Sequence, residues 1–255
     1  VTICTYSARA LASKSSIADL LMQARMIRYD VIGLEETRRR HPFNVVYDAG
    51  KELFLGTCDS RGVGSVGVLV NTSLSMSIDL FEQLTTRIGR LRLKRYGSML
   101  ALIIFVVYAP TSNYDEEEVE ALYMDLEKFY REDRAFYNVI IGDFNAKIGP
   151  RRSSEERHIG THGLEGNEQD KWLSEFIMAT TTIHGNSQFQ KPHPQRWTWE
   201  SPNGEYHNEI DHTIVNRKFC LTVVAVVPKF NTESDLRARF YFSQKGEKAA
   251  KFKNR

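Results

Sequence analysis

The stretch Val139-Ile140-Ile141-Gly142-Asp143-Phe144-Asn145-Ala146 decides how the rest of this chain is interpreted. Its branched apolar residues indicate a short buried strand, which Gly142 ends. Sites in layered α/β proteins collect at such strand ends, because the sheet fixes the backbone while the loop leaves the side chains accessible. Asp143 can take a proton or bind a metal, and Asn145 can donate to a phosphate oxygen. Alternatively, the two residues only build an Asx-type turn.

Length and composition indicate an ordinary globular protein of 255 residues and 29.3 kDa, with a net charge of +2. The longest apolar run, Met99 to Ala109, is shorter than the roughly 20 residues that a membrane-spanning helix needs. The chain opens without Met in a strand-like segment, so we expect no signal peptide and a truncated start. Cys4, Cys58 and Cys220 are scattered thiols without metal-type spacing, typical of a reducing compartment. We therefore expect a nuclear or cytoplasmic protein without membrane contact.

Strands and helices alternate along both halves of the chain, and no repeat or linker separates the halves. We expect one domain over residues 1–242 and a basic tail or linker over 243–255. The simplest assembly is two β-sheets packed face to face with helices outside. The first helix is expected to be capped by Ser15 or Ser16. The clearest predicted strands lie at Val1–Tyr6, Asp30–Leu34, Met99–Val107, Arg196–Trp199, Tyr206–Val215 and Leu221–Val227.

Acidic or amide side chains recur at the ends of these predicted strands. Hydrolysis of a phosphodiester needs a cation that neutralises the phosphate and a group that orients or deprotonates water. Carboxylates from separate strands, without a His/Cys cluster, suit Mg²⁺ or Mn²⁺ better than zinc. The candidate positions are Glu36, Asp143 with Asn145, Asp211 and Asp235.

Two basic clusters are candidate DNA contacts. Arg38-Arg39-Arg40 follows the Glu36 carboxylate, and Arg90, Arg92 and Lys94 alternate with apolar residues along a predicted strand. A run of charges is usually a solvated face, but cations beside a strand-end carboxylate can also meet phosphates. We expect Arg38 and Arg39 to contact the substrate.

Five ordered motifs resemble the successive motifs of the endonuclease/exonuclease/phosphatase superfamily and span nearly the whole chain. They are Leu34-Glu35-Glu36-Thr37, Tyr108-Ala109-Pro110-Thr111, Gly142-Asp143-Phe144-Asn145, Ile210-Asp211-His212 and Ser234-Asp235. Three further segments narrow the resemblance to the endonuclease domain of RTE-type LINE retrotransposons and host proteins derived from them. These are Thr5-Tyr6-Ser7-Ala8-Arg9, Arg196-Trp197-Thr198-Trp199 and Gly246-Glu247-Lys248-Ala249-Ala250-Lys251.

This resemblance implies an α/β (α+β) fold, a four-layered sandwich of two packed mixed β-sheets flanked by helices. It implies Mg²⁺- or Mn²⁺-dependent nicking of DNA. Glu36 would be the principal metal ligand, with Ser7 and Asp235 near the metal, and Asp143 would orient or deprotonate the attacking water. We expect a monomer, fused to a reverse transcriptase in the full-length element.

The remaining roles implied by the resemblance concern the substrate. Asn145 and Tyr108 would hold the scissile phosphate, and Thr198 would lie near the phosphate or the flanking DNA. Asp211 would steady the catalytic His of the family.

Two departures from the family motifs predict impaired activity. Ser7 stands where the first motif carries Asn, and the last motif, which in the family reads Ser-Asp-His, here reads Ser234-Asp235-Leu236-Arg237-Ala238, as if a few residues including the His were deleted. Loss of a group that stabilises charge in the transition state costs about 2.7–4 kcal/mol, or 10²–10³-fold in rate. His212 is a poor substitute because adjacent strand residues point to opposite faces. His207 is also a poor substitute, because four residues of strand would separate it from Asp211 by about 13 Å.

The sequence therefore predicts a DNA-nicking endonuclease domain of retrotransposon origin, whose fold is kept and whose activity is weakened or lost. One alternative is a catalytically inactive nucleic-acid-binding or co-opted module. Another is a phosphatase on small or lipid phosphates, which the superfamily also contains.

Overall fold

The computed structural model describes residues 1–8, 11, 13–47, 50–95, 100–111, 115–133, 135–164, 166–167, 170–201, 203–230 and 233–242. Within these ranges the side chains of residues 219, 227–230 and 233–235 are not described. The predicted tail over 243–255 and the side chain of Asp235 therefore lie outside the described part of the chain.

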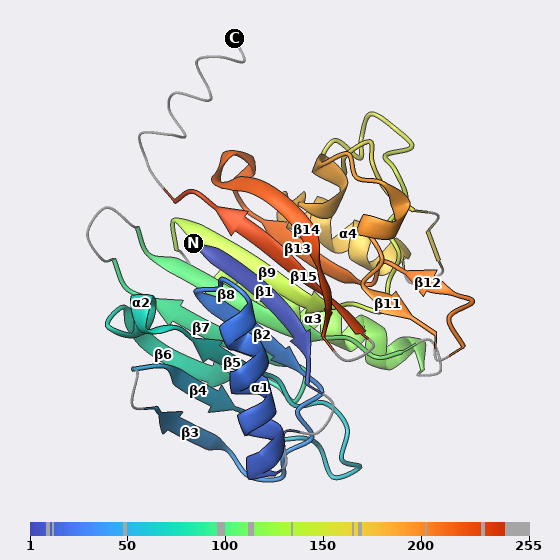
Figure 1. Ribbon diagram of the computed structural model, residues 1–255. Helices are drawn as coiled ribbons and strands as arrows, with labels where there is room; N and C mark the ends of the chain where they lie inside the picture. The colour runs from blue at the N-terminus through green and yellow to red at the C-terminus, as the bar shows by residue number, and fades with distance from the viewer. Residues whose placement is uncertain are drawn as a thin grey trace.

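Two mixed β-sheets form the centre of the molecule (Figure 1). The first sheet has the order β14-β15-β1-β2-β5-β4-β3. Its strands are β1 (Thr2–Ser7), β2 (Val31–Glu35), β3 (Phe43–Val46), β4 (Glu52–Leu55), β5 (Gly67–Val70), β14 (Leu221–Phe230) and β15 (Glu233–Phe240). The second sheet has the order β10-β13-β9-β8-β7-β6. Its strands are β6 (Ile78–Gln83), β7 (Ile88–Leu93), β8 (Leu102–Tyr108), β9 (Tyr137–Asp143), β10 (Ile183–His184) and β13 (Asp211–Val215).

Helices cover the outer faces of the two sheets. Helix α1 (Lys14–Met26) connects the parallel pair β1 and β2, and α3 (Glu116–Glu132) connects the parallel pair β8 and β9. Helix α4 (Asp170–Thr180) packs beside α3, and α2 (Thr72–Ser75) is a single short turn. The N-cap of α1 is Ser13, whose side chain accepts the Ser16 N–H, so the cap predicted at Ser15 or Ser16 is wrong by two or three residues.

Three apolar clusters fill the three spaces between the layers. One lies between α1 and the first sheet, one between the sheets, and one between the second sheet and α3 with α4. The sheets approach closely at Gly33, where a Cβ would come within 2.7 Å of Ile141 Cδ1. The expected four-layered α/β sandwich of two mixed sheets flanked by helices is confirmed. In the described part of the chain, no helix is both long enough and apolar enough to span a bilayer.

The predicted strand Tyr206–Val215 is divided in two. Its first part, β12 (His207–Asn208), pairs with β11 (Trp199–Glu200) in a small separate sheet, and its second part is β13. The break occurs because the Thr198 hydroxyl accepts the N–H groups of Ile210 and Asp211 at 3.0 and 3.1 Å. The 13 Å separation predicted between His207 and Asp211 along one continuous strand therefore does not apply.

Candidate functional site

The carboxyl ends of two parallel strand pairs, one in each sheet, carry the predicted catalytic residues. In the second sheet Tyr108 ends β8 directly opposite Asp143 at the end of β9, and the Ala109 N–H donates to the Asp143 carbonyl at 2.7 Å. In the first sheet Ser7 ends β1 opposite Glu35, immediately before Glu36. Strands β1 and β2 face β8 and β9 across the core, so the sheets bring both sets of ends to one region.

The Tyr108 phenol lies among charged groups from both sheets. Burial raises its pKa, and the carboxylates of Glu36 and Asp143 raise this pKa further, while the cations of Arg87 and Arg38 lower it. Carboxylates from both sheets therefore act on the Tyr108 phenol, and the gathering of Glu36 and Asp143 around one cation stays a prediction. Because its pKa is raised, the phenol keeps its proton at neutral pH and can donate a hydrogen bond.

The turn that carries Glu36 is held by buried hydroxyl groups. Glu36 has a φ of 55°, in the left-handed region that non-glycine residues rarely adopt. The next residue, Thr37, donates its N–H to the Ser65 carbonyl at 3.2 Å, and its hydroxyl bonds to the Ser65 hydroxyl. Ser65 Oγ in turn donates to the Gly56 carbonyl at 2.9 Å. A strained backbone conformation persists only where the surrounding structure imposes it. The contacts of Ser65 impose the left-handed conformation of Glu36 here.

The Glu36 carboxylate forms an ion pair with Arg38. Its side chain is 15% exposed, whereas that of Arg38 is 53% exposed. A cation that binds Glu36 therefore competes with a guanidinium that is largely exposed to solvent.

Asp143 and Asn145 form a compact turn. Asp143 Oδ1 accepts the Asn145 N–H at 2.8 Å, and Asn145 has a φ of 50°. The Asn145 amide donates to the Ala109 carbonyl at 2.9 Å, which ties the turn to the end of β8. The Asx-type turn is thus present, and it holds both side chains beside Tyr108.

Asp211 is held by Thr198, whose hydroxyl accepts the Asp211 N–H at 3.1 Å, and by Thr5. Asp211 lies opposite Asp143 in the β13–β9 pair and is 8% exposed. Thr5 Oγ1 donates to Asp211 Oδ1 at 3.3 Å and accepts the Leu236 N–H at 3.1 Å. Leu236, which directly follows Asp235, is 3% exposed and packs between the sheets. An isobutyl group, and not an imidazole, therefore follows Asp235.

The other predicted site residues have varied positions. Thr198 is 3% exposed, with its hydroxyl engaged by the start of β13 as described above. Arg39 donates to the Leu11 carbonyl at 2.8 Å and stacks its guanidinium 4.6 Å from the centre of the Phe43 ring. Asp235 lies in β15 opposite Val227.

Carboxylates engage two cations of the predicted β7 cluster. Arg90 pairs with Glu82 at 2.6 Å and with Asp133 at 2.5 Å, and Lys94 pairs with Asp79 at 2.8 Å. These charges are partly neutralised within the protein, so a DNA phosphate gains less from them than the sequence alone indicates.

Sequence reasoning missed Arg87, Thr5 and Ser65. Arg87 donates to the Tyr108 carbonyl at 3.4 Å, and its guanidinium lies 5.7 Å from the centre of the Tyr108 ring. Only the β7–β8 pairing brings residues so far apart in sequence together. No local pattern marks these residues, because an isolated Arg, Thr or Ser carries no spacing signal.

The two fully buried histidines face away from Asp211. His212 Nε2 bonds to the Ala146 carbonyl at 2.7 Å, and its Nδ1 lies 2.9 Å from His184 Nε2. His184 Nδ1 lies 2.9 Å from Ser187 Oγ. Each ring nitrogen of the two histidines has a partner other than Asp211, as the prediction that His212 does not replace the missing imidazole requires.

Burial of these imidazoles predicts a loss of stability in mild acid. Burial lowers the pKa of His212 to about 4, and that of His184 also falls well below its usual value. In mild acid the unfolded chain therefore binds protons on these imidazoles that the folded chain does not bind. Stability contributed by His212 is present above its unfolded pKa of about 6.5 and is lost as pH falls toward about 4.

We expect the free energy of unfolding to drop by about 2 kcal/mol from His212 alone between pH 7 and pH 5. Urea unfolding of wild type and His212→Gln at both pH values measures this contribution. Equal pH dependence in the two proteins would contradict a neutral His212. His193→Gln, at an exposed histidine, is the control.

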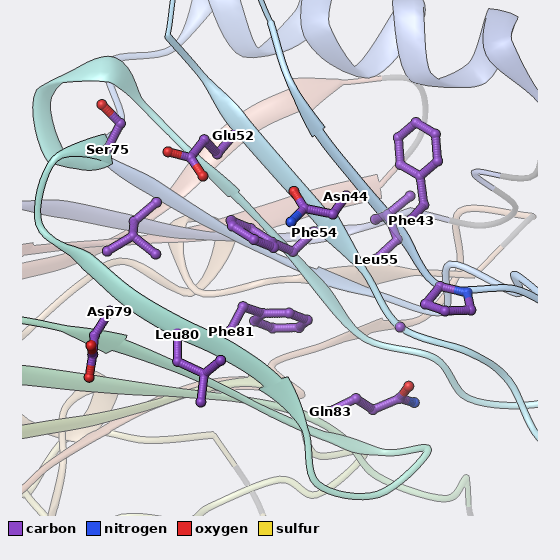
Figure 2. A pocket seen from close by; sticks show the side chains of 13 residues that line it. Phe43, Asn44, Glu52, Phe54, Leu55, Ser75, Asp79, Leu80, Phe81 and Gln83 are labelled. Carbon is purple, nitrogen blue, oxygen red and sulfur yellow. The ribbon is translucent and has the colours of Figure 1, made fainter.

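Two cavities lie outside the strand-end region. A groove of about 740 Å³ opens between β3 with β4 and the edge strand β6, and the Phe54 and Phe81 rings meet there at 5.5 Å (Figure 2). A second, polar cavity of about 470 Å³ lies at the start of α4. Neither is lined by a predicted site residue.

Comparisons with known proteins agree with this geometry. The profile of the Endonuclease/Exonuclease/phosphatase family matches residues 5–235. Craniofacial development protein 2 from Bos taurus is 30% identical over 196 residues, which cover 76% of this chain. The match covers 32% of that relative, so the chain spans about a third of its length.

Solved structures share the fold at low sequence identity. The Xenopus laevis APE2 catalytic domain superposes with a TM-score of 0.68 at 13% identity, over 94% of this chain and 91% of that one. The endonuclease domain of TRAS1, a telomere-specific non-LTR retrotransposon, superposes with a TM-score of 0.63 at 11% identity, over 94% and 98%. Because the family profile matches residues 5–235, nearly the whole length of this chain, the chain belongs to the Endonuclease/Exonuclease/phosphatase family.

Proposed function

We propose that this chain is a metal-dependent phosphodiesterase that nicks DNA, derived from the endonuclease domain of an RTE-type LINE retrotransposon, and that its activity is impaired. The observation that carries the proposal is the geometry at the strand ends, where Tyr108 lies opposite Asp143 and the Asp143–Asn145 turn is tied to the Ala109 carbonyl. The likeness to the TRAS1 endonuclease domain supports the retrotransposon origin.

The donor set fits Mg²⁺ or Mn²⁺. No group of three or more His, Cys, Asp or Glu side chains that could hold a metal occurs among the described residues. Mg²⁺ does not need such a cage, because it binds through one or two carboxylates and keeps several waters. Glu36 would hold the cation, with Ser7 and Asp235 nearby. When bound, the cation neutralises charge on the scissile phosphate.

The side chains of this chain supply the remaining chemistry. The protonated Tyr108 phenol donates to a phosphate oxygen, and the Asn145 amide binds the same group from the adjoining turn. Asp143 accepts the proton of the attacking water, oriented by the hydrogen bond from the Asn145 N–H. In this arrangement the base and the phosphate-binding groups lie on one turn and the strand beside it, so their spacing is fixed before substrate arrives.

The proposed impairment lies at Asp211. Thr5 donates to its carboxylate, and the neighbouring position 236 carries an apolar side chain. A hydroxyl that is already shared with the Leu236 N–H does not supply the positive charge that an imidazolium offers to a pentacovalent phosphorane. The chain keeps the side chains that would bind the metal, accept the proton and bind the phosphate. It lacks one group that stabilises charge in the transition state.

Nicking of supercoiled plasmid tests the proposal. We expect slow nicking that requires Mg²⁺ and stops on chelation. In Glu36→Gln the Mg²⁺ concentration for half-maximal rate should rise about tenfold or more, because the principal anionic ligand is lost. Asp19→Asn, at an exposed acid on α1, should leave this concentration unchanged.

A non-catalytic DNA-binding module is the second candidate, favoured by the apolar Leu236. Salt-sensitive DNA binding without any Mg²⁺-dependent nicking would support this module and exclude the nuclease. Nicking that persists equally in Glu36→Gln at every Mg²⁺ concentration would contradict the assigned metal ligand.

A further inference from the structure

A chain of hydrogen bonds runs from the edge of the second sheet to the Asp143–Asn145 turn. It starts at Ser187 in a 3-10 turn (Asn186–Gln188), passes through His184 on β10 and His212 on β13, and ends at the Ala146 carbonyl. Both imidazoles are at most 1% exposed, and their ring centres are 4.9 Å apart. Ala146 directly follows Asn145, so the chain ends one residue from a proposed phosphate-binding group.

The direction of every hydrogen bond in this chain follows from its last acceptor. A carbonyl oxygen only accepts, so His212 Nε2 carries a proton, and in the neutral ring its Nδ1 accepts. His184 Nε2 must then donate to His212 Nδ1, which leaves His184 Nδ1 as an acceptor of the Ser187 hydroxyl at 2.9 Å, a proton for which the His184 carbonyl at 3.1 Å also competes. Ser187 Oγ itself accepts the Gly160 N–H at 2.7 Å. One arrangement of protons therefore satisfies all four ring nitrogens.

The surrounding charges keep both rings neutral. The cation facing the pair is Arg196, which lowers the pKa of both histidines in addition to the larger effect of burial. Glu209 holds the Arg196 guanidinium at 3.0 Å and is itself buried. Ser187 Oγ could accept a proton from His184 Nδ1 by turning its own proton to the His184 carbonyl at 3.1 Å, so burial and Arg196, and not the lack of an acceptor, keep the pKa values of both rings low.

The Ala146 end of the hydrogen-bond chain adds a bond to a turn that is also held by the Phe144 N–H on the Ile210 carbonyl and the Lys147 N–H on the Asn167 amide oxygen, both at 2.9 Å. Asn145 has a left-handed φ, and its carbonyl receives only a 3.2 Å bond from the Asn167 amide, whereas the His212–Ala146 bond is 2.7 Å. The His212 ring also packs against Phe144, with the ring centres 5.9 Å apart. His212 thus contacts the turn through both its ring face and its Nε2–H.

The same 3-10 turn also fixes Asp211. The Asn186 amide donates to the Asp211 carbonyl at 2.9 Å and accepts the Thr213 N–H at 2.9 Å. The segment that donates to His184 therefore also sets the position of β13 around His212.

We infer that His212 is a positioning residue for the Asp143–Asn145 turn, and that the Ala146 carbonyl sets its tautomer and, through it, the direction of the bonds to His184 and Ser187. The hydrogen-bond chain stands on geometry alone; what the held turn does rests on the proposed phosphodiesterase function. The inference separates His212 from catalytic residues, because its ring touches the turn and its nitrogens do not face the Tyr108 region.

Nuclear magnetic resonance of ¹⁵N-histidine-labelled protein tests the tautomers directly. We expect both buried rings to be neutral with the proton on Nε2, and unchanged from pH 5.5 to pH 8. A proton on Nδ1 of His212, or titration of either ring in this range, would overturn the inference. This measurement needs no variant and no activity.

Hydrogen exchange then tests the positioning role with two variants. His212→Gln keeps an N–H donor at a similar reach, whereas His212→Leu leaves the Ala146 carbonyl without its donor. We expect amide exchange in residues 143–147 to rise about tenfold in His212→Leu and to stay near wild type in His212→Gln. Equal exchange in both variants, or an equal rise in β1, would contradict a specific hold on the turn.

Nicking kinetics provide the functional readout. If the turn positions the phosphate, His212→Leu should lower kcat while KM stays near wild type, and His212→Gln should recover most of the loss. His193→Leu, at an exposed histidine, is the matched control. If wild type does not nick DNA at all, the proposed function fails, and the tautomer and exchange measurements still decide the positioning role.

Discussion

The variant Leu236→His is expected to nick supercoiled plasmid about 10²–10³-fold faster than wild type in the presence of Mg²⁺. Position 236 is next to Asp211, because the Leu236 N–H bonds to Thr5 Oγ1 and the same hydroxyl donates to Asp211 Oδ1. An imidazole there can take the Asp211 carboxylate from Thr5 and become positively charged beside it. Initial nicking rates of the two proteins measure the gain.

Two controls separate the imidazole from a general change at this buried position. Leu236→Asn introduces a polar side chain of smaller size without a group that becomes cationic, and it should give no gain. Adding Asp211→Asn to Leu236→His should remove the gain, because the imidazolium loses its counter-ion. If Leu236→His is folded by circular dichroism and nicks no faster than Leu236→Asn, position 236 is not where the missing group acts.

The variant Asp143→Asn is expected to lose about 10²–10⁴-fold in nicking rate, measured most sensitively in the Leu236→His background. The asparagine oxygen can still accept the Asn145 N–H, so the turn stays closed while the proton acceptor is removed. We therefore expect an unchanged melting temperature together with the loss of rate. Asp143→Ala should lose both the rate and part of the turn.

The exposed acid Asp19 provides the control, since Asp19→Asn removes the same charge from α1, on the outer face of the first sheet. A rate for Asp143→Asn within a few-fold of its parent would show that another group accepts the water proton. The neighbouring Tyr108 phenol is a poor alternative base, because burial and two carboxylates raise its pKa.

Local patterns in the sequence determined much of the fold. The apolar runs that predict β2, β8 and β9 are nearly continuous, because these strands are buried on both faces. In helix α1 the buried residues Ile17, Leu20 and Ala24 likewise recur at helical spacing in the sequence. These elements depend on neighbours in sequence and on burial, so periodicity finds them.

Contacts between residues far apart in sequence account for the differences. The strand predicted over Tyr206–Val215 divides because the Thr198 hydroxyl accepts two N–H groups at the start of β13. The cations predicted to face DNA on β7 meet carboxylates from β6 and the end of α3. Neither contact can be predicted from the local sequence pattern, because hydroxyl and charged groups show no regular spacing that identifies their partners.

The sequence by itself determined which chemical groups stand at the strand ends, including Glu36, Tyr108, Asp143 and Asp211, and that an imidazole is missing after Asp235. Only the tertiary structure decided which groups surround them: Arg38 on Glu36, Arg87 on Tyr108, Thr5 on Asp211, and His212 under the Asp143–Asn145 turn. The physical reason is that a strand end depends on a few consecutive residues. The partners of a strand end depend on the register of two sheets, which residues more than 200 positions apart in the sequence set together.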